Sequence, residues 1–470
     1  MKWFVNIFLL FCYLGNAMSN IFASIEGACG GAKAPGAPPV GQEAPPPYTT
    51  LPAGSSEVGA TAWSSPPVVG AMGYSQSGFK LGYMDFVPKM IKKKLMGSVY
   101  EDFSSLVQRV NSWIEEHAGI CVVSCETITW TGRNYDHIYA DKTYLVHGQR
   151  MLRGLRLWYL TELVPSPQRH RMCQILHCRT FLPKPHETFS QLLRRVNEAL
   201  IKENIGGKIL CVETVPLYST MSEYKPGAVN PDVTRWTGDI NKATVALCIR
   251  VYIIVTGETA YENIGYQDFV PEHDQRHADN KGFEVCSEVM DKAARWVARQ
   301  QGVRFTNVQT LSLKYKKKIP FEERCIYTAS ETSVYLSIVR VYFVTSTGRT
   351  DADSLLPCRL TYRTFTPNQT VLGSTSTPPE FEDTRNLCDR VNQWLHITGA
   401  RLFSVETVAI RRTVGSLGAE ATFFRPRSES ERWIYHIRMY LNGDYVESPT
   451  ALSIVMCQPK LAVSEPNLFY

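Results

Sequence analysis

The sequence lacks the short motifs by which the common catalytic sites are recognised. It has no glycine-rich phosphate loop, no Gly-x-Ser-x-Gly and no His-Glu-x-x-His. The nearest metal candidates are Cys173-x3-His177-Cys178 and His273-x3-His277, and neither supplies the four converging ligands of a structural zinc site. The sequence therefore predicts no metal, no cofactor and no catalytic residue.

The chain also has little net charge. Charged residues make up 20% of the chain and the net charge is +6, spread along its length. A nucleic-acid-binding domain has a stronger and more clustered positive charge, so no nucleic acid partner is expected. The hydrophobic content of 44% is enough for a buried core, and 470 residues can form three or four domains.

The cysteines show no disulfide framework. There are thirteen, and they do not recur at matched positions in the similar stretches described below. Cys125 and Cys211 lie in apolar, strand-like runs and Cys388 lies on an apolar helix stripe, which is where free cysteine acts as a small hydrophobe. Because a disulfide framework in a repeating protein should itself repeat, reduced thiols are favoured.

One pattern is abundant instead. FSSLVQRVNSWIEEHAGICVVSCET, which starts at Phe103, returns in similar form from Phe189 and Thr384, and in disguise from Cys286. In each copy, positions 0, 3, 4, 7, 10 and 11 carry the same stripe, which is mostly apolar and typical of one face of an α-helix. A tryptophan lies at position 10 in three copies, and we expect Trp113, Trp296 and Trp394 to be buried in the core.

Strand-like runs follow each helix. The first ends near Glu-Thr, or Gln309-Thr310 in the third copy, and the second has an arginine at a common position. A third run ends in Phe-x-Pro, at Phe181, Phe269 and Phe365, and the same signature at Phe86 precedes the first helix. The pattern predicts a helix followed by about three strands in each copy.

The recurring glutamate and arginine form a predicted polar pair on adjacent strands. The pairs are Glu126 with Arg156, Glu213 with Arg250, and Glu406 with Arg438; Arg340 faces Gln309. One interpretation is a repeated salt bridge that fixes strand register. The alternative is a polar site for a charged ligand in each copy. No second acid or nucleophile accompanies the pair, so general acid–base catalysis is not supported.

The predicted fold is α+β, with four tandem repeats of about 95 residues, each a helix packed on a small antiparallel sheet. The expected repeats are 80–178, 179–264, 265–361 and 362–470, after a disordered segment rich in proline, glycine, alanine and serine at 26–79. A three-stranded sheet has open edges, so we expect neighbouring repeats to pair through them.

The N-terminal region supports two incompatible interpretations. Residues 1–25 resemble a signal peptide, or an anchor if uncleaved, and predict a secretory location. Pro45, Pro46, Pro47 and Tyr48 match the Pro-Pro-x-Tyr pattern of WW-domain ligands, whose polyproline II conformation fits an aromatic groove. A secreted chain would not meet cytosolic WW domains, unless translation also begins at Met18 and gives a cytoplasmic protein.

The function expected from these patterns is non-catalytic binding. The first hypothesis is a scaffold whose protein partners are held by the variable loops between strands. The second is an enzyme or small-ligand binder with a site assembled between repeats. The third is a cytosolic WW-domain adaptor. A membrane is a partner only if the N-terminal segment remains as an anchor.

Overall fold

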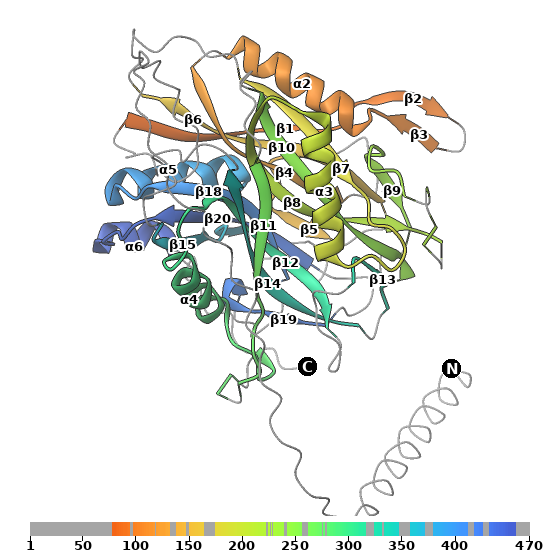
Figure 1. Ribbon diagram of the computed structural model, residues 1–470. Coiled ribbons are helices and arrows are strands. Elements are labelled where there is room, and N and C mark those ends of the chain that lie inside the picture. Colours follow the sequence, from red (N-terminus) through yellow and green to blue (C-terminus); the bar gives the residue numbers. More distant parts are fainter. Residues whose placement is uncertain are drawn as a thin grey trace, which may run out of the picture. The chain divides into compact units, whose positions relative to one another are not determined.

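The computed structural model describes residues 78–456. Its gaps are 95–96, 118, 132–137, 147–149, 164–173, 222–223, 226, 228, 239–241, 256–261, 275, 278–279, 316–323, 331–332, 347–357, 372–378, 412–417 and 426–431. Residues 1–25 and the proline-tyrosine motif lie outside the described residues, as does all but the end of 26–79. The described chain is α+β, as predicted, with helices and small antiparallel sheets (Figure 1).

Four long strands, which we call the middle strands, each form the centre of an antiparallel sheet. They are β6 (Arg150–Glu162), β10 (Thr244–Val255), β14 (Val334–Ser346) and β20 (Arg432–Asn442). Along one side of each lies an inner strand: β4 (Ile120–Thr131), β8 (Gly207–Ser219), β12 (Arg304–Tyr315) and β18 (Leu402–Arg411), respectively. Along the other side lies an outer strand: β1 (Phe79–Phe86), β7 (Ile175–Phe181), β11 (Glu262–Phe269) and β15 (Leu360–Phe365).

One helix lies between each outer strand and the next inner strand in the chain. The helices are α2 (Phe103–Glu116), α3 (Phe189–Glu203), α4 (Cys286–Val297) and α5 (Thr384–Thr398), and Figure 1 shows them along the outside of the strands. Asp102, Thr188 and Asp383 begin three of them by accepting a backbone hydrogen bond from the first turn. Val285, before α4, has no such side chain, and Glu420 from a distant segment accepts from the Ser287 N–H instead (2.9 Å).

The apolar stripes are the buried faces of the helices, as predicted, but the tryptophans differ. Trp394 is fully buried, because Tyr445 covers its ring and Glu447 accepts from its indole N–H (2.8 Å). The helix α6 (Pro449–Val455) also packs on α5 there. Trp113 and Trp296 are only half-buried, so the prediction of three equivalent buried positions was wrong. The stripe alone could not show which helix end is covered by a later segment.

Each outer strand pairs with the middle strand that follows it in the chain. The preceding helix packs on β7, β11 and β15, and α5 packs on β1. The strand β7 thus pairs with β10 and not with β6, so the predicted order of a helix and then three strands in one sheet was wrong. Asn111 of α2 exchanges two hydrogen bonds with the backbone of Leu176 on β7 (2.9 and 2.7 Å). Asn197 on Ile264 and Asn392 on Leu81 make the same contact. Each asparagine thus satisfies one N–H and one C=O on the open edge of an outer strand.

Short strands tie the sheets together. Each lies between the inner and middle strands of one sheet and pairs with the middle strand of another. They are β9 (Arg235–Thr237) on β6, β13 (Ile326–Thr328) on β10, β19 (Phe423–Phe424) on β14 and β5 (Tyr144–Val146) on β20. The remaining elements are the hairpin β2 (Met90–Lys94) with β3 (Gly97–Tyr100), the pair β16 (Gln369–Val371) with β17 (Glu380–Phe381), and η7 (Gly418–Glu420). No helix in the described ranges is both long and apolar enough to cross a membrane.

Candidate functional site: a cavity where four strands meet

The inner strands of the four sheets contact one another. The strand β4 contacts β8 and β18, and β12 also contacts β8 and β18. The four inner strands therefore close into a ring, which we call the inner ring. The first and last sheets in the chain are neighbours in this ring, although they are separated by more than 250 residues of sequence.

Each inner strand binds its neighbour through a glutamate or glutamine. The Glu126 carboxylate accepts from the backbone N–H of Thr407 (2.7 Å) and from the Thr407 hydroxyl (2.5 Å). The same contact joins Glu213 to Thr127, Glu406 to Thr310 and, through its amide group, Gln309 to Thr214. In every case the threonine directly follows the equivalent glutamate or glutamine of the neighbouring inner strand. Glu126, for example, binds Thr407, which follows Glu406. This hydrogen-bonded relay fixes the relative position of the four sheets.

The recurring arginines lie opposite these residues in strand register, as predicted. Glu126 is opposite Arg156, and the other pairs have the same register. The direct salt bridge was, however, a wrong interpretation. Arg156 instead donates to both carboxylate oxygens of Asp85 (2.7 Å each) and to the Thr407 hydroxyl (2.9 Å). The sequence could not show this, because Thr407 comes from another sheet and Asp85 from an outer strand.

The four arginines have two kinds of surroundings, which alternate along the chain. Arg156 and Arg340 bind an aspartate, Asp85 or Asp268, on the outer strand. Arg250 binds Thr180 (2.9 Å) and the Pro231 carbonyl (3.3 Å). Arg438 correspondingly binds Thr364 (2.9 Å) and the Ala419 carbonyl (3.3 Å). All four also donate to the relay threonine of the next sheet. These four arginines are therefore buried and have hydrogen-bond partners within the protein, which indicates a structural role.

A cavity of about 380 Å³ lies at the inner ring, and all four sheets contribute to its wall. The relay residues Glu126, Glu213, Gln309 and Glu406 belong to this wall. Further along the strands the wall becomes apolar and aromatic. The residues there include Leu145, Met151, Tyr218, Val245, Leu247, Leu313, Tyr327, Phe424 and Tyr435. The cavity is thus lined by both polar and apolar residues.

Arg153 is the one arginine among the residues that line this cavity. It lies on β6, three residues before Arg156, and only 7% of its surface is exposed. Among the described residues, its guanidinium has neither a hydrogen-bond acceptor nor an ion-pair partner. The centroid of the Tyr218 ring lies 6.0 Å from the guanidinium carbon of Arg153. The corresponding positions of the other middle strands carry Leu247, Ser337 and Tyr435.

Burial shifts the ionisation of several groups in the wall. It raises the pKa of the Glu126 carboxyl to about 7, against the opposing effect of the nearby Arg156. Burial also raises the pKa of Glu213, and that of Tyr218 to about 12. The pKa of Arg153 falls to about 10, mainly through burial, so this group remains a cation at pH 7. Burial thus disfavours the charged form of these carboxyls, whereas Arg153 is a cation of the same wall that has no partner among the described residues.

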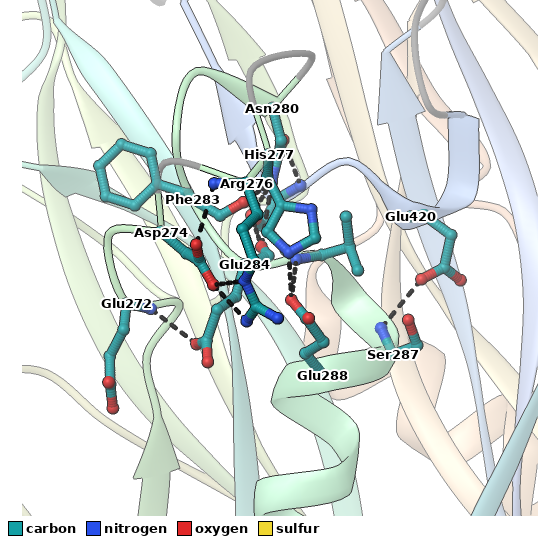
Figure 2. Close-up of polar contacts among 12 residues, drawn as sticks. Glu272, Asp274, Arg276, His277, Asn280, Phe283, Glu284, Ser287, Glu288 and Glu420 are labelled. Carbon is teal, nitrogen blue, oxygen red and sulfur yellow. Dashed lines mark hydrogen bonds and ion pairs between the residues drawn. The ribbon is translucent and has the colours of Figure 1, made fainter.

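A second polar cluster lies at the start of α4, and Figure 2 shows it. Asp274 accepts from the backbone N–H (2.9 Å) and the guanidinium (2.8 Å) of Arg276, and His277 lies 2.8 Å from Glu288. His273 packs on the ring of Phe283, with the ring centroids 5.4 Å apart. No set of three or more potential metal ligands gathers within the described ranges. Cys173 lies outside the described residues.

Sequence reasoning missed Arg153. The signal was present, because MLRGLRLWYL has a second arginine inside an apolar run. That arginine does not recur in the other similar stretches, and attention to recurring residues therefore passed over it. The next residue, Gly154, leaves no room for a side chain, since a Cβ at this position would lie 2.4 Å from the Trp130 ring.

Comparisons of this chain with protein-family models, with curated proteins and with solved structures found no match.

Proposed function

We propose that this chain is a non-catalytic binding protein that takes a small ligand in the central cavity. The observation that carries the proposal is the cavity of about 380 Å³ with walls from all four sheets. Protein interiors are close-packed and leave few voids larger than a water molecule. A space of this size is within the range of small-molecule sites, and its wall combines apolar surface with a few polar groups, as such sites do.

We infer further that the chain consists of four tandem α+β repeats of about 95 residues, arranged around the cavity. The common strand order of the four sheets supports this inference. The common register of the arginines and the relay from each inner strand to the next support it as well. In this arrangement, the site is assembled between repeats, so that no linear motif would mark it.

The second candidate function is an enzyme that uses Glu126 as a general base. The observation that favours it is the pKa of about 7, which suits proton transfer near neutral pH. Against it, Glu126 already accepts from Thr407 and from the indole N–H of Trp158 (2.8 Å). A general base must reach its substrate, and Glu126 would have to release these donors first. We therefore favour binding.

A thermal-shift screen of the full chain tests the proposed function. A set of small metabolites that includes anions, cations and neutral compounds is compared on the parent protein and on the cavity-filling variant Leu247→Trp. We expect at least one class of compound to raise the Tm of the parent and to lose this effect in the variant. Val371→Trp, at a position with 48% exposure, is the matched control and should behave as the parent does. A parent that responds to no compound, or a response that survives cavity filling, would exclude ligand binding in the cavity.

A further inference from the structure

A buried arginine without a partner is unusual. Only 7% of the Arg153 surface is exposed, and no acceptor among the described residues binds its guanidinium. A buried charge without a partner is costly, and proteins normally pair it or neutralise it. Arginine does not lose its proton at neutral pH, so an anion that enters the cavity would supply the charged partner that the described residues do not.

The other arginines of the middle strands show that this protein does provide partners for buried guanidiniums. Arg156 and Arg340 each have an aspartate, and Arg250 and Arg438 each have hydroxyl and carbonyl acceptors. Of these five arginines, only Arg153 lacks a partner among the described residues, and it is the one that lines the cavity. Its main chain is fixed, because its N–H donates to the Thr234 carbonyl (2.6 Å). The backbone that carries the guanidinium is thus fixed by hydrogen bonds.

We propose that Arg153 is the anchor of a small organic monoanion, and that a carboxylate with an apolar or aromatic body is the class of ligand bound. This inference rests on the proposed function and specifies its ligand. A guanidinium can bind a carboxylate through two parallel hydrogen bonds. Beside it, Met151 and Tyr218 offer apolar and aromatic surface to the body of the ligand.

The cation content of the wall favours a carboxylate over a phosphate. Arg153 is the one arginine among the residues that line the cavity, and these residues include no lysine or histidine. A dianionic phosphate would bring two negative charges to this single cation. A monoanion balances Arg153 one to one, and a body without further charge suits the apolar wall.

Isothermal titration calorimetry of the full chain tests the proposal with three pairs of probes: benzoate with benzyl alcohol, phenylacetate with 2-phenylethanol, and 2-naphthoate with 2-naphthylmethanol. Inorganic phosphate is titrated separately. We expect at least one carboxylate to bind about 10- to 100-fold more tightly than its alcohol, the range of one charged hydrogen-bonded contact. Arg153→Gln should abolish this preference and Arg153→Lys should keep part of it. The matched control is Arg150→Gln, at an exposed position of the same strand, which should change Kd less than twofold.

Three results would overturn the inference and leave the proposed function intact. An alcohol could bind as tightly as its carboxylate, the preference could survive Arg153→Gln, or phosphate could bind in place of the carboxylates. Unfolding of Arg153→Gln, seen by circular dichroism, would also overturn it, because the arginine would then be structural. If no probe binds and the screen above finds no ligand of any charge, the proposed function fails together with the inference.

Discussion

Two arginines on the same strand, β6, have opposite surroundings. Arg156 is fully buried and donates to Asp85 and Thr407. Arg153, three residues earlier, points to the other face of the strand and has no partner among the described residues. The two side chains are almost equally enclosed, so burial does not distinguish them. The two arginines differ instead in how many of their guanidinium N–H groups have an acceptor.

This difference separates structure from function. The residues that recur in all four sheets, Arg156 among them, are satisfied by the protein itself and hold the inner ring together. Arg153, which occurs once, is the residue for which we propose a partner from outside the chain. In a molecule with such regular architecture, a departure from the regularity is better evidence of a binding site than the regularity.

The largest expected effect comes from replacing Arg156, the arginine of β6 that has partners. Arg156→Gln leaves the Asp85 carboxylate buried without its cation, so we expect the free energy of unfolding to fall by about 3–5 kcal/mol. Denaturant titration measures this. The double variant Arg156→Gln/Asp85→Asn should recover much of the loss. Arg385→Gln, whose side chain is 75% exposed, is the control and should change stability by less than about 0.5 kcal/mol. A loss below about 1 kcal/mol for Arg156→Gln would contradict the structural role.

The second expected effect concerns pH and Glu126. Its pKa is about 7 in the folded protein and 4.5 as the ordinary value. Between these values the folded state binds more protons than the unfolded state, so stability falls as pH rises through this window and the difference is constant above it. The contribution is about 3 kcal/mol. Glu126→Gln should therefore lose less stability between pH 4.5 and 7 than the parent, and the exposed Glu115→Gln should not. Parallel curves for the parent and Glu126→Gln would show that the pKa is not raised.

A smaller effect is expected at Arg250, which has hydroxyl and carbonyl acceptors in place of a carboxylate. Arg250→Gln would leave Thr180, Thr127 and Pro231 without a donor, but it would not strand a formal charge on an aspartate. We expect a loss of about 1–3 kcal/mol, less than for Arg156→Gln. Denaturant titrations of the two variants side by side test the order. Equal losses of stability in the two variants would mean that an aspartate partner stabilises the protein no more than hydroxyl and carbonyl acceptors do.

The sequence predicted the elements better than their partners. The apolar stripes and the Glu–Arg register follow from local periodicity, and both agree with the structure. The bond between Glu126 and Thr407 spans 281 positions of sequence, and no local pattern indicates which sheets become neighbours. The three-residue strand β5 is also too short to show a period, although it joins the first and last sheets.

The cavity could not be predicted for the same reason. Its wall comes from four sheets, and each contributes residues that look like ordinary strand positions. Arg153 is the exception, because the corresponding positions of the other middle strands carry Leu247, Ser337 and Tyr435. A search for departures from the common pattern would have singled out Arg153, whereas a search for recurring residues selects the structural relay.

The most direct test of this account is the free energy of unfolding of Arg153→Gln without ligand, measured in the same denaturant titration as the parent protein. Because the variant removes a buried cation that has no partner in the described protein, we predict that stability stays within about 1 kcal/mol of the parent or rises. A loss of about 3–5 kcal/mol, like that expected for Arg156→Gln, would show that Arg153 belongs to the structural set and would contradict the account.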